Sequence, residues 1–311
     1  MTNKQKPIVQ KKRTAKKPRL TTDAKPAPKP AHQVKGDDSA GERIQKVLAR
    51  GGLASRREIE RWLAEGRIRV NGQLAVPGLR LKAGDFLQVN ERVVHWEKFT
   101  QQKTRVLLYH KPIGEVVTRR DPEGRPTVFT RFPELLTGRW LTVGRLDINT
   151  SGLLLVTNNG ELANRLMHPS SDVEREYAVR ILGNVSDALL ARLAAGVELD
   201  DGFAKFNEIH FSGGEGANKW YYVTVSEGRN RLVRRLWESQ HVVVSRLMRV
   251  RYGPVVLPEY LKSGSYYELS DKELDIVFEF AGLKPANAEP LPASAGVKEP
   301  SKSPKKKSPH L

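Results

Sequence analysis

The feature that most limits how this chain can fold is the contrast between its two ends and its centre. Residues 1–40 carry eleven basic and three acidic side chains, and residues 284–311 carry six Lys and two Glu. Both segments contain too little bulky apolar surface to offset the entropy lost on folding, so we predict disordered basic tails. A folded region is expected between Gly41 and Leu283.

Composition narrows the class of protein further. The chain has 311 residues, and its 53 Lys and Arg exceed its 35 Asp and Glu by 18, so an acidic partner such as RNA or DNA is expected. Lys-rich tails that only keep a protein soluble would explain part of the same charge. The absence of cysteine excludes disulfides and thiolate zinc sites. No apolar run approaches the ~20 residues that cross a bilayer, and the basic N-terminus is not followed by a signal-like apolar segment. We therefore expect a cytoplasmic monomer without membrane contact.

Residues 41–98 have the pattern of a small basic domain. Ile44, Val47 and Leu48 recur at helical spacing, and Ser55 with Glu58 forms the pattern of a capping box at the start of a second helix. Short strands are expected after the second helix, at 67–70, 79–81 and 86–89, the first running into an Asn-Gly turn. Basic side chains lie on the polar faces of both helices, where they either contact solvent or bind a ligand: Arg43, Lys46, Arg56 and Arg57.

This segment resembles a known RNA-binding module. The stretches Ile44–Ala49, Ser55-Arg56-Arg57 and Gly66–Gly72 are similar to the domain named after ribosomal protein S-four. The resemblance implies binding of structured RNA through the basic helix face, but no particular reaction.

A polar linker is predicted at 99–105, followed by a larger domain at 106–283. Strands are expected at 106–109, 153–157, 177–181, 220–225 and 242–244, and helices at 161–167, 187–195 and 231–238. No regular βαβ alternation is present, so the fold class expected is α+β, built on a mainly antiparallel mixed sheet. Phosphate-cradling loops, a dinucleotide-binding glycine pattern, a His-Glu-x-x-His motif and a nucleophile elbow are all absent from the sequence.

Three stretches of the second domain could carry chemistry. Asp147 lies in a glycine-flanked loop, Gly144–Leu155, before an apolar strand; such a loop aspartate is either catalytic or turn-stabilising. Tyr177 lies on a strand and is either a core residue or a ring that stacks on an extruded base. In Glu227–Trp237, arginines alternate with an apolar stripe, and one of them buried beside Asp147 would keep that carboxylate ionised.

Together these stretches resemble pseudouridine synthase family A of the ribosomal small subunit. Gly144-Arg145-Leu146-Asp147 with Gly152–Leu155 matches the motif bearing the essential aspartate, and Glu227-Gly228-Arg229 with Val233-Arg234-Arg235 matches the basic motif. The stretches 121–129, 165–170 and 212–216 are most similar to family members that modify RNA of the large ribosomal subunit. The similarity covers residues 42–270 and leaves out both tails.

The resemblance implies that the chain isomerises a uridine of large-subunit ribosomal RNA to pseudouridine, with no cofactor and no metal. Asp147 would begin glycosidic cleavage as a base or as a nucleophile, Tyr177 would stack on the flipped base, and Arg234, or less favourably Arg235, would pair with Asp147. The residues expected to contact RNA are Arg43, Lys46, Arg56, Arg57, Arg119, Arg120, Arg125, Arg145, Arg249 and Arg251. The alternative is a non-catalytic RNA-binding factor of ribosome assembly, which would not explain why Asp147, Tyr177 and Arg234 occur together.

Overall fold

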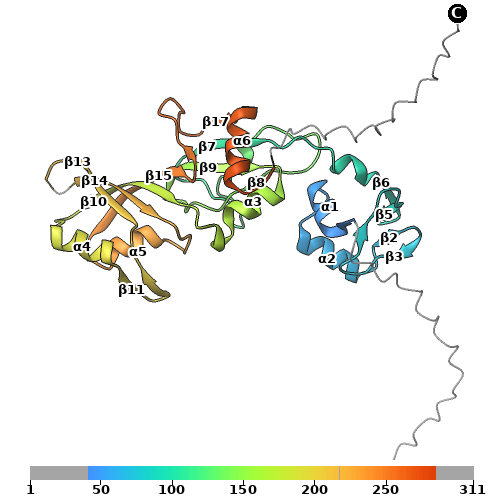
Figure 1. Ribbon diagram of the computed structural model, residues 1–311, viewed down its shortest axis with the longest axis horizontal. Coiled ribbons are helices and arrows are strands. Elements are labelled where there is room, and N and C mark those ends of the chain that lie inside the picture. Colours follow the sequence, from blue (N-terminus) through green and yellow to red (C-terminus); the bar gives the residue numbers. More distant parts are fainter. Residues whose placement is uncertain (1–40, 217, 285–311) are drawn as a thin grey trace, which may run out of the picture.

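A computed structural model describes residues 41–216 and 218–284 of the protein. The predictions for residues 1–40 and 285–311 lie outside this range. In Figure 1 the described chain forms a small domain at the N-terminal end and a larger, elongated domain beside it. Within these residues, no helix has the length and apolarity needed to cross a membrane.

The first domain packs two short helices against small antiparallel sheets. Its elements are β1 (Glu42–Arg43), α1 (Ile44–Arg50), α2 (Arg56–Ala64), β2 (Ile68–Val70), β3 (Gln73–Leu74), β4 (Arg80–Leu81), β5 (Leu87–Val89), β6 (Arg92–Val94) and the 3-10 helix η1 (Trp96–Phe99). The strands β3, β2, β5 and β6 form one sheet in that order, and β1 pairs with β4. Ser55 caps α2 by accepting a hydrogen bond from the Glu58 amide at 3.1 Å, whereas the Glu58 carboxylate bonds to Trp62. The predicted cap is confirmed, but only half of the capping box forms.

The second domain is built on a nine-stranded sheet. Its elements are β7 (Val106–Lys111), η2 (Val128–Arg131), β8 (Leu141–Thr142), β9 (Ser151–Thr157), α3 (Gly160–Met167), η3 (Pro169–Ser171), β10 (Arg175–Leu182), α4 (Asp187–Ala195), β11 (Val197–Leu199), β12 (Gly202–Ala204), β13 (Glu208–Gly213), β14 (Asn218–Val225), α5 (Leu232–Glu238), β15 (Val243–Tyr252), β16 (Val255–Val256), β17 (Tyr266–Glu268) and α6 (Asp271–Phe280).

The order of this sheet divides it into two halves. The main path runs β13-β14-β10-β15-β9-β7-β17, and among the named strands its pairings are antiparallel except for β9 with β15. That parallel contact is short, with Ser151 opposite Met248 and Gly152 opposite Arg249. We call the β9–β15 contact the seam. The predicted α+β class with a mainly antiparallel mixed sheet is confirmed.

Glycine is required at the seam. Gly152 has a φ of +102°, and a Cβ placed on it would lie 2.2 Å from the Arg249 carbonyl oxygen. A side chain at this position would therefore separate β9 from β15 or displace the loop before β9.

Separate cores support the two halves of the sheet. One lies between β10, β14 and β15 and the helices α4 and α5, and includes Phe206, Tyr221 and Trp237. On the other side of the seam, α3 and α6 pack against β7 and β9. The opposite face of β7 and β9 is covered by the 128–146 segment, through residues such as Trp140. Each half is thus stabilised by its own buried apolar surface.

Most predicted elements of the second domain are confirmed. The helix Asp187–Ala195 has the predicted bounds and its Ser186 cap, and the five predicted strands are present, most of them longer than predicted. The helix Asp271–Phe280 was not predicted, although Ser270 and Glu273 form a complete capping box at its start. Strand β15 was greatly underestimated, because arginines interrupt its apolar pattern.

Candidate active site

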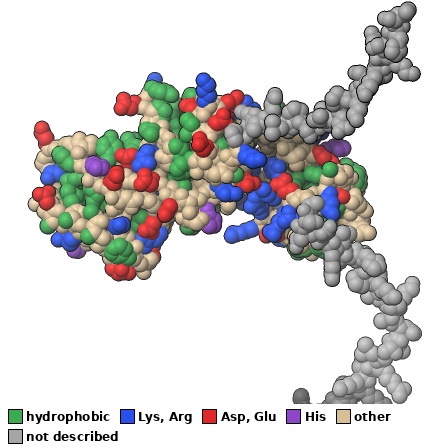
Figure 2. All heavy atoms as spheres, in the orientation of Figure 1, with side chains coloured by type: hydrophobic (Ala, Val, Ile, Leu, Met, Phe, Trp, Pro, Cys, Tyr) green, Lys and Arg blue, Asp and Glu red, His purple; other side chains and the backbone are tan. Residues whose placement is uncertain are grey.

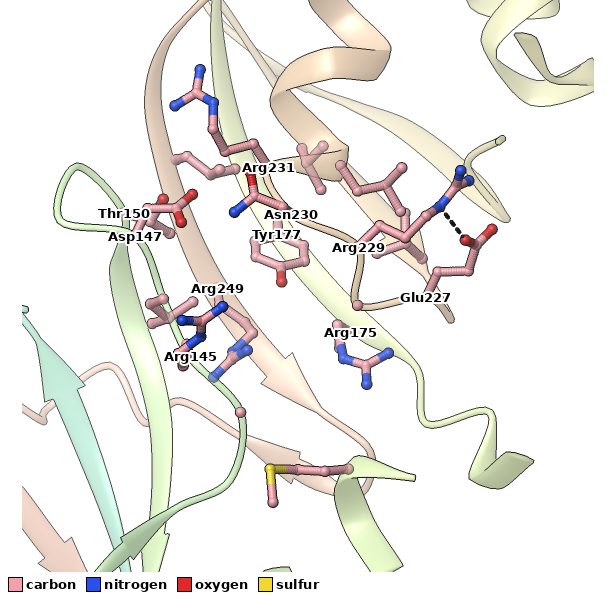
Figure 3. Close-up of a pocket in the computed structure, with 18 of the residues that line it drawn as sticks. Arg145, Asp147, Thr150, Arg175, Tyr177, Glu227, Arg229, Asn230, Arg231 and Arg249 are labelled. Carbon is pink, nitrogen blue, oxygen red and sulfur yellow. Dashed lines mark ion pairs between the residues drawn. The ribbon is translucent and has the colours of Figure 1, made fainter. Parts of the chain in front are cut away.

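A cavity of about 500 Å³ opens at the seam of the large sheet. It receives side chains from the loop before β9, from β10 and β15, and from the segment leading into α5. Figure 3 shows Asp147 and Tyr177 facing this space with arginines around it. The arginines that line it are Arg145, Arg175, Arg229, Arg231 and Arg249. The Asp147 carboxylate thus lies among several cationic groups.

Asp147 belongs to a tight turn that leads directly into β9. The Thr150 amide donates a hydrogen bond to the Asp147 carbonyl at 3.0 Å, which closes the turn one residue before the strand begins at Ser151. No hydrogen bond or ion pair to the Asp147 carboxylate is found over residues 41–216 and 218–284. The backbone is fixed and the carboxylate is free to meet a ligand.

Lys111, which was not predicted as a site residue, holds this turn in place. Its side chain is 0% exposed, and its ammonium group donates to the carbonyl oxygens of Pro112, Asp147 and Thr150 at 2.8, 3.1 and 2.9 Å. These three bonds use all three donors of the ammonium group. Burial lowers the pKa of Lys111 to about 8, while the negative charges of Glu115 and Asp147 act in the opposite direction. Lys111 ends β7, so the predicted strand 106–109 stopped two residues too early to include it.

Glu115 adds a buried negative charge near Lys111. It is 4% exposed and accepts hydrogen bonds from the Tyr109 hydroxyl at 2.5 Å and from Arg131 Nε at 3.1 Å. Burial, together with this hydrogen bond to Glu115, raises the pKa of Tyr109. The turn carrying Asp147 therefore rests on a charged network inside the domain.

Tyr177 lies on β10 and packs against the cores of both sheet halves. It is opposite Arg249 on β15, while its neighbour Glu176 is opposite Arg251. A β-bulge between these pairs places Arg249 and Arg251 on opposite faces of the sheet. The prediction that the two arginines share a face is therefore wrong.

The two arginines consequently have different surroundings. Arg249 is 2% exposed, donates to the Leu153 carbonyl at 2.7 Å and lines the cavity. Arg251 forms ion pairs with Glu174 and Glu176 away from the cavity. Of the two, Arg249 is the one placed to meet a ligand at the Asp147 site.

Arg234 is buried, at 7% exposure, but it does not form the predicted ion pair with Asp147. Its guanidinium donates to the carbonyls of Val244 at 3.0 Å and Asn149 at 2.9 Å, so it binds the backbone of the Asp147 turn and not the carboxylate. The position near the start of α5 explains this reach. Arg235 is paired with Asp201 at 2.8 Å and is not available to Asp147.

The remaining predicted RNA contacts fall into two groups. Arg145 lines the cavity, whereas Lys46, Arg56, Arg57 and Arg119 line a groove between the two domains. Outside both hollows lie Arg43 at the start of α1, Arg120 and Arg125. Arg125 is paired with Asp121 and Glu123.

Several cavity residues were not singled out from the sequence. Arg175 and Arg231 were quoted within stretches but given no role, and Lys111 was not considered. A lysine that ends an apolar run and precedes proline was the available signal for Lys111. For the arginines, the sequence offered no feature that separates a cavity residue from a solvated one.

Comparison with known proteins agrees with this arrangement. Residues 105–239 match the model of the RNA pseudouridylate synthase family, and residues 42–87 match the S4 domain. The chain belongs to the RNA pseudouridylate synthase family, with an S4 domain at its N-terminal end.

Its relatives include proteins named ribosomal large subunit pseudouridine synthase B. The one from Haemophilus influenzae is 51% identical over 284 residues, covering 91% of this chain and 78% of the relative. That from Escherichia coli K12 is 54% identical, covering 78% and 84%. That from Pseudomonas aeruginosa is 57% identical over 79% of this chain, and the matched part spans 64% of that relative. A solved pseudouridylate synthase aligns with a TM-score of 0.53 at 25% identity, covering 76% of this chain and all of the other.

Proposed function

We propose that the protein converts one uridine of large-subunit ribosomal RNA to pseudouridine. The observation that carries the proposal is the Asp147 carboxylate, unpartnered among the described residues and held on a fixed turn in a cavity lined by five arginines. The arginines suit the phosphates of a nucleic acid, and the carboxylate suits chemistry at the sugar or its glycosidic bond. The names of the relatives favour large-subunit RNA over other RNAs as the substrate.

The reaction breaks the N1–C1′ bond, rotates the uracil and joins C5 to C1′. The C5 proton is lost and N1 regains one, so the reaction is an isomerisation without net change in composition. Asp147 begins it either by removing the C2′ proton or by attacking C1′. Both routes need an ionised carboxylate within reach of the sugar, and the base must first leave its stack at a cost of a few kcal/mol.

The neighbouring residues have distinct roles in this proposal. Tyr177 stacks on the extruded uracil and can assist removal of the C5 proton. Arg234 is a positioning residue, because it binds the Asn149 carbonyl of the Asp147 turn. Arg145 and Arg249 face the cavity and hold phosphates or the uracil carbonyls.

We further place the chain in pseudouridine synthase family A of the ribosomal small subunit, closest to large subunit pseudouridine synthase B. Residues 41–98 then form the RNA-binding domain, 99–105 the linker and 106–283 the catalytic domain. Phe99 packs against the core of the first domain, so the part of the linker outside that domain would begin after it. Action on ribosomal RNA is consistent with a cytoplasmic monomer.

The test combines purified protein with a large-subunit ribosomal RNA transcript labelled with tritium at uracil C5. Tritium release, with one new pseudouridine found by chemical mapping, is the expected result. Mapping of ribosomal RNA from cells lacking the protein should show the same site unmodified. RNA binding without tritium release from either naked or partly assembled RNA would instead identify a non-catalytic assembly factor.

A further inference from the structure

A second hollow, which we call the interdomain groove, lies between the two domains. Its volume is about 1010 Å³, and it is lined by α1 and α2 on one side and by the 117–119, 139–142 and 158–164 segments on the other. Figure 2 shows Lys and Arg side chains gathered at the junction of the domains. The basic residues that line the groove are Lys46, Arg50, Arg56, Arg57, Arg119, Arg139 and Lys284.

The groove contains too few carboxylates to neutralise these cations. The acidic residues among those that line it are Glu42 and Glu161. Lys46 bridges both of them, at 3.2 and 3.0 Å, and Arg50 also pairs with Glu42. The arginines Arg56, Arg119 and Arg139 have no carboxylate partner within the part of the chain that the structure describes. We call these three residues the groove triad.

The groove triad is held by groups that carry no negative charge. Arg119 donates to the Trp140 carbonyl, and its guanidinium lies 4.4 Å from the centre of the Phe129 ring. Arg139 is half-buried, and its Nε has no acceptor among the described residues. Arg56 extends from α2 to Gly160, the first residue of α3 in the other domain.

The three charges oppose one another. Desolvation lowers the pKa of Arg139, with a further contribution from the charge of Arg56, and the pKa of Arg119 is lowered in the same way by burial and by Arg139. Fixed like charges in a partly desolvated groove are unfavourable unless an anion joins them. The arrangement is therefore that of an anion-binding site.

The groove is also continuous with the catalytic cavity. Thr142 and Met167 line both hollows. A polymer that enters the cavity can therefore extend into the groove without leaving the protein surface. Planar guanidinium groups bind phosphate oxygens in pairs, which suits a polyphosphate strand.

We propose that the groove triad binds backbone phosphates of the RNA strand beside the target uridine, joining the two domains through the RNA. The proposal rests on the proposed function for the identity of the ligand. Because Arg56 belongs to the first domain and Arg119 and Arg139 to the second, one phosphate segment contacts both. The bound strand thereby fixes the orientation of the domains while its uridine occupies the Asp147 cavity.

The test measures RNA binding and thermal stability in the same variants. In Arg139→Gln, affinity for the ribosomal RNA fragment should fall about tenfold at low salt, and the slope of log Kd against log salt should decrease by about one contact. The melting temperature of the free protein should stay equal or rise, because a repulsive charge is removed. The matched control is Arg61→Gln on α2, since Arg61 is exposed, paired with Glu58 and Glu65, and outside the groove. It should bind RNA as the wild type does.

Coupling between domains gives the sharper result. Arg56→Gln combined with Arg139→Gln should weaken binding less than the product of the single effects, because both contact one phosphate segment. Arg139→Lys keeps the charge and serves if the Gln variant is poorly folded; it should bind with intermediate affinity. Wild-type affinity in the Arg139 variants, or loss of affinity only together with a lower melting temperature, would overturn the proposal.

Failure of the groove and failure of the enzyme are distinguishable. A uridine-free RNA of the same length cannot be a substrate but still carries the phosphates, so its binding should depend on the groove triad. If that dependence is absent while pseudouridine forms, the groove assignment is wrong and the enzyme assignment stands. If the dependence is present without any tritium release, the groove assignment stands and the proposed reaction is wrong.

Discussion

The Asp147 cavity and the interdomain groove are both rich in arginine, but their arginines are held differently. In the cavity, Arg249 donates to a backbone carbonyl and Arg229 is paired with Glu227 and Asp201. In the groove, Arg56, Arg119 and Arg139 have no carboxylate partner among the described residues. The first arrangement fixes geometry around one free carboxylate, and the second leaves positive charge available. We infer that the cavity governs turnover and the groove governs affinity.

The largest effect is expected from Asp147→Asn. The neutral amide is neither a base nor a nucleophile, so tritium release should fall at least about a thousandfold. RNA affinity should remain near that of the wild type, because the groove is unchanged. Turnover near the wild-type rate would remove Asp147 from the chemistry.

Lys111→Met should follow, with a loss of about a hundredfold in turnover. Methionine has a similar shape but leaves the carbonyls of Pro112, Asp147 and Thr150 without their donor, so the turn carrying the carboxylate shifts. The control is Lys103→Met, because Lys103 is exposed and paired with Asp271. A variant that loses RNA affinity but keeps its turnover at saturating RNA would contradict this role.

Tyr177 separates stacking from hydroxyl chemistry. Tyr177→Ala should lower turnover roughly thirtyfold, the value expected when a base loses its stacking partner. Tyr177→Phe keeps the ring and its packing against both cores, so it should lose much less. Equal single-turnover rates for all three proteins would show that the ring is only structural.

Reversing charge on the groove side should weaken binding instead of catalysis. Arg56→Glu with Arg57→Glu should reduce RNA affinity about tenfold or more at low salt, with little change in turnover at saturating RNA. Both residues are exposed in the first turn of α2, where glutamate suits the helix dipole, so the fold should be retained. Arg92→Glu, on β6 and outside both hollows, controls for net charge. Unchanged affinity in the double variant would mean that these arginines are only solvated.

The smallest expected effect is a pH dependence of stability caused by Lys111. Its pKa of about 8 in the folded protein lies below the 10.5 of an unperturbed lysine. Between these values the unfolded chain binds more protons, so raising the pH stabilises the folded state. Urea unfolding of wild type and Lys111→Met at pH 7.5 and 9.5 should show the difference in unfolding free energy moving in favour of the wild type. A constant difference would mean that Lys111 titrates normally.

The sequence predicted the elements better than the contacts between them. Asp147, Tyr177 and the arginine stretch before Trp237 could be found because the motif residues are close in sequence. The partner of Arg234 could not, since a carbonyl on the Asn149 turn is available only after β9 and β15 have come together. The faces of Arg249 and Arg251 were predicted incorrectly because a single-residue bulge inverts the alternation of a strand. Arg139 was not singled out, because its importance depends on which charges its neighbours lack.

The seam has a consequence for how a substrate affects the protein as a whole. Asp147 comes from one half of the sheet, while Tyr177, Arg229 and Arg231 come from the other, and only two residue pairs join β9 to β15. A uridine held between these groups therefore acts as a clamp across the weakest line of the domain. Bound RNA should slow amide hydrogen exchange most at residues 151–152 and 248–249, and much less inside either core. The catalytic centre would then also be the place where the substrate makes the enzyme rigid.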